Sequence, residues 1–465
     1  MRNRLLTATM LAAGLIAGCA SPEPIGEKAT AASRASLPET PRTWAMIGAK
    51  VGEVPVGWVD AFNDSLLSKL VAEAQHNNRN LQAAAAAVDG ARALTRQAGA
   101  ALLPQVNLSG GPQGSGSLNG AGGATTTQNI SLQASWEPDL WGRVRAGQQA
   151  AQFSAQSAEA DYRFAQHSLA AGVARAYFVA IEARQQVAIA QSRLDALAET
   201  GRIVDLQYEN GLVSAQDRAL TRSDMASARD SLASAEGGTR DALRALEQLL
   251  GRYPAAELDV GDTLPAPPKA PPPGLPSEIL ERRPDLVAAE RRIASAMGST
   301  AQAKAAKLPQ INLTTSIGGS APALSDLLNP ANLLWTAAAN ILVPVIDGGA
   351  RQAQVEAATA EQKQAIAAYA DAALTAFAEV EGALDQQVVL ERRRVALTEA
   401  YQQAQEALRI GQLRYKEGES SLLDVLTIQQ QVFGARSNLL SVERSQLQQF
   451  IDLNLALGGD WRSGE

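Results

Sequence analysis

The sequence predicts a mixed fold, in which a membrane β-barrel is continued by a barrel of long α-helices packed as coiled coils. Three observations support this prediction. The chain repeats itself at an offset of about 205 residues, each copy contains paired stretches of alternating apolar and small polar residues, and each then runs for about 65 residues without proline. The expected architecture is an internally duplicated chain with four strands, three copies of which form a 12-stranded barrel continued by a helical tunnel.

Composition narrows the class of protein. The chain has 465 residues, a net charge of -7 and only 4% aromatic residues, with acidic and basic side chains interspersed. There is no basic stripe of the kind that binds nucleic acid, and we expect no nucleic-acid partner. The abundance of Ala and the Leu and Val periodicity favour long helices over several mixed cores.

The first 18 residues are predicted to be an export signal. Arg2 and Arg4 precede a short apolar stretch that ends Ile16-Ala17-Gly18-Cys19, which resembles the lipobox of bacterial lipoproteins. Cys19 would then carry N-acyl and S-diacylglycerol lipid as the mature N-terminus, and Ala20 favours sorting to the outer membrane. The alternative is a plain secretory signal with an incidental cysteine. Cys19 is the chain's only cysteine, so no disulfide or thiolate site is expected.

Internal duplication defines the predicted domains. The segment Leu103–Leu108 (LPQVNL) recurs as Leu308–Leu313 (LPQINL), and the match continues to the Leu-Gly pairs at Gly251 and Gly458. The predicted parts are a signal peptide (1–18), a lipidated, extended equatorial segment (19–58), a first repeat (59–251), a Pro-rich equatorial linker (252–283), a second repeat (284–458) and a C-terminal tail (459–465).

Each repeat is expected to begin with a helix, about 65–101 or 284–306, that a proline at 104 or 309 ends. Strand pairs follow at about 104–138 and 309–346, the returning strand near Trp335 to Val345 alternating least cleanly. No other stretch of about 18 apolar residues exists, so any membrane span is expected to be β. A half-buried soluble sheet has the same periodicity and remains the alternative. The Gly-rich stretch 110–128 would be an external loop.

Long helical hairpins, 143–250 and 351–457, follow each strand pair. Apolar and small residues from Ala190 to Tyr208, and from Leu397 to Tyr415, recur at alternating spacings of four and three, which predicts knobs-into-holes packing. Turns at Gly211 and Gly418 return the chain along a shorter helix. We expect that helix to stack end to end with the helix that leads into the strands.

Four strands per chain leave open edges, and unpaired backbone groups in hydrocarbon cost several kcal/mol each. Because barrels of about 8 strands are filled by side chains, about 12 strands from three chains are the smallest symmetric solution with a lumen. The sequence therefore predicts a homotrimer embedded in outer-membrane lipid.

Short motifs add a resemblance to a known family. The chain resembles the TolC-like outer-membrane efflux proteins (outer membrane factors), specifically the NodT-type lipoproteins of resistance-nodulation-division efflux systems. The matching residues are Trp58, Phe62, Asp64 and Leu66-Leu67; Trp136 to Arg143 (WEPDLWGR); Tyr208 to Ser214 (YENGLVS); Arg282 to Leu286 (RRPDL); and Leu308-Pro309.

This resemblance implies a function as well as a fold. It implies a trimeric channel in the cell outer membrane with a periplasmic tunnel, docked onto a periplasmic adaptor (membrane fusion protein) that bridges to an inner-membrane resistance-nodulation-division pump. The channel would be a passive exit duct for drugs, toxic compounds or metal ions. It would be no enzyme, with no catalytic residues, no metal site and no cofactor besides the lipid on Cys19.

The resemblance also suggests a periplasmic gate. Ser214-x-x-Asp217 and Ser421-x-x-Asp424 have the spacing of helix capping boxes, which is a sufficient structural reason for both aspartates. By resemblance, Asp424 would line the closed aperture, with Leu423 as an apolar constriction, and Asp217 would latch neighbouring hairpins. Departures from the family pattern are Thr427, where a second aspartate often stands, and Ser420, where some members have a latching arginine. Arg414, Arg218 or Arg222 would replace that arginine.

The turns resemble the tips that meet the adaptor. These residues are Gly211, Leu212, Val213, Ser214, Gly418, Glu419 and Ser420. The alternative is that the glycines only supply the positive φ of a helix end.

Other function classes remain open. The duct of a type I protein secretion system would share the fold, whereas a soluble periplasmic coiled-coil adaptor would share the helices and lack the strands. An enzyme is not favoured, because the only histidines, His76 and His167, belong to no metal-spaced or nucleophilic cluster.

Overall fold

The computed structural model describes residues 25–39, 41, 43–45, 52, 54, 56–116 and 125–461. The expected signal peptide and Cys19 lie outside these residues. The chain forms two compact units. We name the first the strand unit (residues up to Pro38, Ala86–Ala160 and Leu286–Ala372) and the second the hairpin unit (Glu39–Ala85, Asp161–Asp285 and from Ala373 on). No described helix combines the length and apolar character that a membrane crossing requires.

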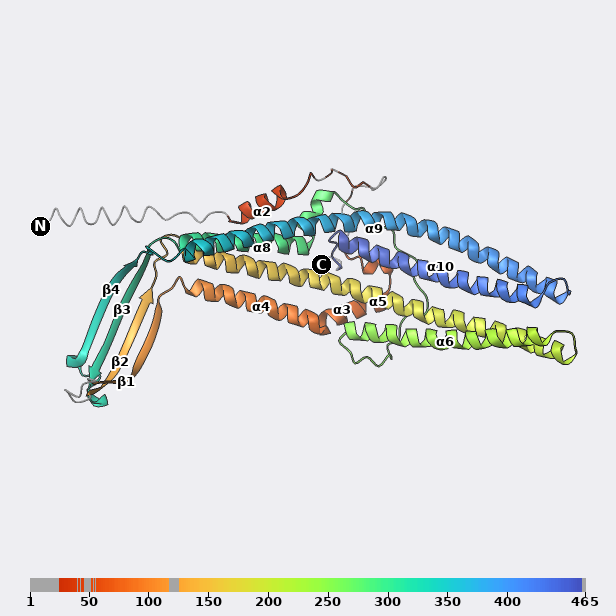
Figure 1. The fold of residues 1–465 in the computed structure, drawn as a ribbon, viewed down its shortest axis with the longest axis horizontal. Coiled ribbons are helices and arrows are strands. Elements are labelled where there is room, and N and C mark those ends of the chain that lie inside the picture. The colour runs from red at the N-terminus through yellow and green to blue at the C-terminus, as the bar shows by residue number, and fades with distance from the viewer. Residues whose placement is uncertain are drawn as a thin grey trace. The chain divides into compact units, whose positions relative to one another are not determined.

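Helices and strands follow the duplicated order that the sequence predicts (Figure 1). The first copy comprises η1 (Asp60–Phe62), α3 (Ser65–Asn77), α4 (Arg79–Ala100), β1 (Gln105–Ser115), β2 (Thr125–Trp136), α5 (Arg143–Glu209) and α6 (Ala215–Leu249). The second comprises η2 (Pro276–Glu278), α7 (Ile279–Arg282), α8 (Pro284–Ala305), β3 (Gln310–Ala321), η3 (Leu324–Asp326), η4 (Pro330–Asn332), β4 (Leu333–Leu342), α9 (Ala350–Lys416) and α10 (Leu422–Ala456). A helix, α2 (Ile25–Ala35), precedes both copies, so the predicted extended conformation of segment 19–58 is wrong at these residues.

The strand unit contains one antiparallel sheet in the order β1-β2-β3-β4. Val106 pairs with Ala134, Leu132 with Ile317, and Ile317 with Trp335, without interruption of the register. The two copies therefore join through β2 and β3. The outer edges of β1 and β4 have no strand beside them within the described residues.

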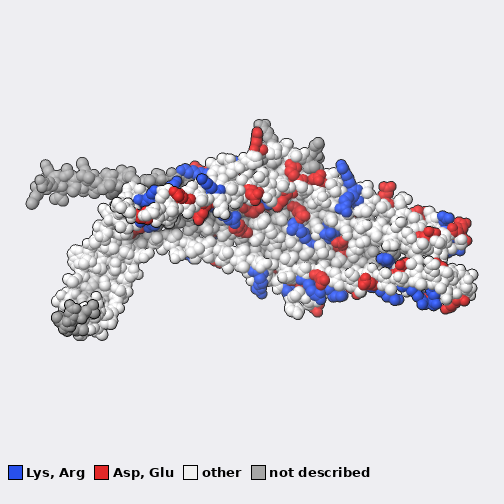
Figure 2. All heavy atoms as spheres, in the orientation of Figure 1, with Lys and Arg blue, Asp and Glu red and all other residues white. Residues whose placement is uncertain are grey.

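The register places most of the apolar residues of the four strands on one face, whereas Leu334, Ala338 and Leu342 of β4 lie on the opposite face. That face, the apolar face, consists of Val106, Leu108, Ile130, Leu132, Ala134, Trp136, Ile311, Leu313, Thr315, Ile317, Leu333, Trp335, Ala337, Ala339 and Ile341. The opposite, polar face includes Gln105, Asn107, Gln133, Asn312, Ser316 and Asn340. None of the four described strands contains an Asp, Glu, Lys or Arg, and the sheet is correspondingly white in Figure 2. β4 alternates at Trp335, Ala337, Ala339 and Ile341, and it ends before Val345.

The motif Trp136–Arg143 forms the turn from β2 into α5. Glu137 accepts two hydrogen bonds from the Arg143 guanidinium (3.1 and 2.6 Å), and Asp139 accepts the backbone N–H groups of Val144 and Arg145 at the start of α5. Gly142 adopts φ +74°. These contacts fix the chain direction where a strand becomes a helix, which explains the residue types in this motif.

Helices of the strand unit approach closely through small residues. A Cβ added to Gly298 in α8 would lie 2.9–3.0 Å from the backbone and Cβ of Ala150 in α5. Hydroxyl groups bond across the same interfaces, Ser157 to the carbonyl oxygen of Ala288 (3.0 Å) and Thr300 to that of Ala358 (3.0 Å). Close packing here depends on small side chains.

The hairpin unit has an aromatic core. Phe62 lies 4.9 Å from Phe178 of α5 and 5.2 Å from Phe450 of α10, measured between ring centroids. Asp64 caps α3 by accepting the N–H groups of Leu66 and Leu67, and it also accepts the hydroxyl of Tyr177 (2.8 Å). This core therefore includes contacts from three residues that matched the family pattern in the sequence: Trp58, Phe62 and Asp64.

The expected continuous helix over 65–101 is wrong at Asn78, where α3 ends and α4 begins. Asn78 accepts the N–H of Leu81 at the start of α4 (3.0 Å), so its side chain caps the new helix. In the second repeat, Arg283 occupies the position equivalent to Asn78, between α7 and α8. Asparagine is not a strong helix breaker, and the break is therefore not evident from sequence periodicity.

Candidate functional site

The two hairpin turns have the same backbone geometry. Gly211 (φ +74°) and Gly418 (φ +79°) follow the ends of α5 and α9. The N–H of Leu212 bonds to the carbonyl of Gln207 (2.9 Å), and that of Glu419 bonds to the carbonyl of Arg414 (2.8 Å). This is a Schellman ending, which needs a residue that tolerates positive φ. Both glycines therefore supply the positive φ that this helix ending needs.

Both return helices begin with the predicted capping box. Ser214 and Ser421 share φ -80° and ψ 158°; the Ser214 hydroxyl accepts the N–H of Asp217, and the Ser421 hydroxyl that of Asp424. Each aspartate in turn accepts the N–H of its serine, at 3.1 and 3.0 Å. The two aspartates therefore fix the helix starts, whatever else they do.

The first turns of α10 have one buried and one exposed face. Leu422 and Leu426 pack with Leu197 and Val204 of α5 and Ala228 of α6. Leu423 is 58% exposed, and Asp424 and Thr427 are exposed beside it. The three predicted gate residues on α10 thus share a surface that no other described segment of the hairpin unit covers. We call Leu423, Asp424 and Thr427 the α10 gate face.

Asp424 is ionised at neutral pH. Hydrogen bonds from the Ser421 hydroxyl and backbone N–H, together with the nearby Arg414, hold the pKa of the Asp424 carboxyl below its ordinary value. The carboxyl is fully exposed, so its charge remains available to a passing ion.

Among the three candidate arginines, the fold separates Arg414 from the others. Arg218 and Arg222 both bind Asp205 within the first hairpin (2.6 and 3.2 Å), and Arg218 also lies over the Tyr208 ring. The Arg414 side chain is 57% exposed, and its guanidinium lies 3.8 Å from the Glu419 carboxylate and 3.5 Å from the Glu419 carbonyl oxygen. Of the three, Arg414 has the weakest contact within the chain.

Two residues outside the predicted gate and tips connect the hairpins. Tyr415 of α9 donates a hydrogen bond to the side-chain oxygen of Gln207 in α5 (2.9 Å). Burial, followed by the charge of Asp217, raises the pKa of the Tyr415 hydroxyl. Tyr415 is one of the periodically spaced residues of α9, but only the fold shows that its hydroxyl contacts Gln207.

The tip residues differ in exposure. Leu212 is 74% exposed, whereas Val213 packs partly against the cluster of Leu197, Val204 and Leu422. Glu419 is exposed, and Ser420 is half-buried with its hydroxyl near the carbonyl oxygen of Gly411 (3.4 Å). Fewer than the seven predicted tip residues are therefore fully exposed to a partner.

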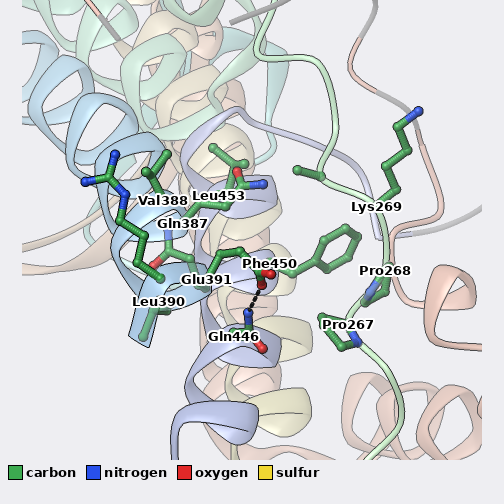
Figure 3. A pocket seen from close by; sticks show the side chains of 13 residues that line it. Pro267, Pro268, Lys269, Gln387, Val388, Leu390, Glu391, Gln446, Phe450 and Leu453 are labelled. Atoms are coloured by element: carbon green, nitrogen blue, oxygen red, sulfur yellow. Dashed lines mark hydrogen bonds between the residues drawn. The ribbon is translucent and has the colours of Figure 1, made fainter. Parts of the chain in front are cut away.

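A cavity of about 620 Å³ lies elsewhere in the hairpin unit, between the Pro-rich linker and helices α9 and α10 (Figure 3). Pro267 and Pro268 face Leu390, Phe450 and Leu453 across it. Its one carboxylate, Glu391, bonds to Gln446 (2.9 Å) and Arg394 (2.7 Å). The Glu391 carboxylate is therefore already bonded within the chain. No predicted gate or tip residue lines the cavity.

The sequence profile of the family described as "outer membrane efflux protein" matches residues 70–252 and again 275–459. The chain belongs to the outer membrane efflux protein family. Because the profile matches twice, the predicted internal duplication is confirmed.

Curated relatives and solved structures agree with this assignment. The efflux protein is 32% identical over 420 residues to the pyoverdine export outer membrane protein OpmQ of Pseudomonas aeruginosa, covering 87% of this chain and 88% of that one. It is 29% identical over 407 residues to the probable outer membrane lipoprotein SilC of Salmonella typhimurium, with 87% and 88% covered. A crystal structure of CusC superposes with a TM-score of 0.81 at 29% identity, covering 91% of this chain and 98% of that chain.

These findings confirm the predicted fold class, outer-membrane location and efflux function. The efflux protein is an outer-membrane channel with a strand domain for the barrel and helices for the tunnel. Its matched relatives are transport proteins.

Proposed function

We propose that three copies of this efflux protein close their sheets into one 12-stranded barrel and form a passive exit duct. The observation that carries the proposal is the uncharged four-stranded sheet, with one apolar face, one polar face and two open edges. In a membrane, such edges need partners, and the apolar face needs lipid. The polar face then lines the lumen.

The duct acts in a tripartite system. A periplasmic adaptor binds the exposed part of the two turns, chiefly Leu212 and Glu419, and links the channel to an inner-membrane resistance-nodulation-division pump. The relatives are named for export of pyoverdine and, in CusC, for cation efflux. Drugs, toxic compounds or metal ions are accordingly the class of cargo, and the chain catalyses no reaction. A type I secretion duct is the second candidate.

Cys19 carries the lipid anchor of the mature chain. The lipobox residues and the printed name of SilC, a probable outer membrane lipoprotein, support this assignment. Mass spectrometry of the mature N-terminus should show cleavage before Cys19 with one N-acyl and one diacylglycerol group. An unmodified mature N-terminus elsewhere would refute lipidation.

The α10 gate face is proposed to form the closed periplasmic aperture. A ring of ionised carboxylates attracts cations and excludes anions. In planar bilayers, Asp424→Ala should raise single-channel conductance and lower cation selectivity, with Asp241→Ala, an exposed carboxylate of α6 away from the turns, as the matched control. Equal currents from the two variants would remove Asp424 from the gate, and absence of any channel from the wild type would remove the proposed function itself.

Adaptor docking is tested at the turns. Leu212→Asp combined with Glu419→Lys should abolish resistance in cells that depend on this channel, while trimer yield and bilayer conductance stay normal. Ser192→Asp, an exposed position within α5, is the control for added surface charge. Full resistance in the double variant would place docking elsewhere.

A further inference from the structure

The loop between β3 and β4 exposes two large apolar side chains that the proposed duct does not use. Leu324 is 72% exposed and Leu328 is 73% exposed, whereas Leu327 between them is buried at 7%. Asp326 is the only charged residue from Pro322 to Asn332. Two exposed leucines in one short loop amount to an apolar patch that would be costly in water.

This loop is folded onto the apolar face of the sheet. A Cβ added to Gly319 would lie 2.5 Å from the carbonyl oxygen of Leu327 and 3.4 Å from Cδ2 of Leu333. Gly319 therefore points to the same side as Leu333, which belongs to the apolar face, and the loop backbone covers it. Any larger residue at Gly319 would push the loop away.

Hydrogen bonds within the loop hold this conformation. The Asn332 side-chain amide donates to the carbonyl oxygen of Asp326 (2.9 Å), and the N–H of Asn329 donates to the same carbonyl (3.2 Å). Asn329 in turn caps η4 by accepting the N–H of Ala331 (3.1 Å). The exposure of Leu324 and Leu328 is thus set by the folded loop.

We propose that Leu324 and Leu328 insert among the acyl chains of the outer leaflet and anchor the external rim of the barrel in lipid. The inference rests on the proposed function, which assigns the apolar face to lipid. The loop backbone covers Gly319 on that face, and Gly319 shares the face with Leu333 and with Trp335, which is 77% exposed. Aromatic and apolar residues at this level are typical of barrel rims in membranes. The loop consequently lies outside the pore and does not plug it.

Single-cysteine labelling tests this placement, because lipidated Cys19 leaves no other thiol in the chain. Leu324→Cys and Leu328→Cys would carry an environment-sensitive dye in the trimer, reconstituted in vesicles that contain lipids brominated on their acyl chains. Leu132→Cys on the apolar face and Gln133→Cys on the polar face are adjacent controls. Wild-type protein, carried through the same labelling, should take up no dye.

At positions 324 and 328 we expect blue-shifted emission, quenched by brominated lipid as strongly as at Leu132 and protected from aqueous iodide. Iodide quenching at 324 and 328 equal to that at Gln133, with Leu132 still quenched by lipid, would overturn the loop placement and leave the barrel intact. If the dye at Leu132 also escapes lipid quenching, the assignment of the apolar face to lipid fails as well.

Discussion

The side-chain amide of Asn78 donates a hydrogen bond to the carbonyl oxygen of Leu249 (2.9 Å), in the last turn of α6. Arg283 makes the equivalent bond in the second repeat, to the carbonyl oxygen of Ala456 (3.2 Å) at the end of α10. Each bond joins the last turn of a return helix to the residue that lies between two other helices of the same repeat, α3 and α4 or α7 and α8. The expected end-to-end stacking is therefore real, and Gly251 and Gly458 permit it because each packs closely against the backbone there.

Asn78→Ala should lower the thermal denaturation midpoint of the trimer. Asn78 is 6% exposed, and its loss leaves a helix start uncapped and a carbonyl unpaired, which together cost about 1–3 kcal/mol per chain. Asn78→Asp keeps the acceptor for Leu81 but places a carboxylate oxygen against the Leu249 carbonyl oxygen, so it should restore the helix cap without restoring stability. Asn210→Ala, an exposed asparagine, is the control; equal midpoints for Asn78→Ala and Asn210→Ala would contradict the role of Asn78.

Replacing Arg283 should cost more stability with methionine than with lysine. The guanidinium is 5% exposed and binds Asp285 (2.8 Å), Glu379 (2.5 Å) and the Ala456 carbonyl. Because Glu379 is 48% exposed and screened by water, the loss should be about 1–3 kcal/mol, below that of a fully buried pair. Urea denaturation followed by circular dichroism would measure both variants, and a methionine variant as stable as the wild type would show the network to be dispensable.

Gly298→Ala should destabilise the channel although alanine is the better helix former by about 1 kcal/mol. The new methyl group would meet the backbone of Ala150 at 3.0 Å or less, which forces α5 and α8 apart. Gly238→Ala, in a helix position with open space around it, should instead be neutral or stabilising. The two melting temperatures should move in opposite directions; a shared upward shift would disprove the close contact.

Cation selectivity should be independent of pH between 5 and 8 and fall only in stronger acid. Because the pKa of Asp424 lies below the ordinary aspartate value of about 3.9, the carboxyl stays charged until the pH falls below about 4. The ionised carboxyl contributes to selectivity above its folded-state pKa, and this contribution is lost as the pH falls through that pKa. Reversal potentials across a salt gradient would measure this, and a titration near pH 6 would point to a group other than Asp424.

Periodicity and turn chemistry determined the elements of this protein from sequence alone. The proline-free stretches became α5 and α9, and the Ser-x-x-Asp spacings became two capping boxes of equal geometry. Both are local: the helix period and the cap depend on residues within one turn of each other. The alternation in β1 to β3 likewise predicted the two faces of the sheet.

Only the tertiary structure decided which of these residues meet. It showed that Asn78 divides the first helix, that Asp205 binds both Arg218 and Arg222, and that Tyr415 reaches Gln207. It also placed the Leu324–Leu328 loop on the apolar face. These partners lie on different elements or on opposite sides of a turn, and their pairing follows from the packing of helices and strands, which no local sequence pattern encodes.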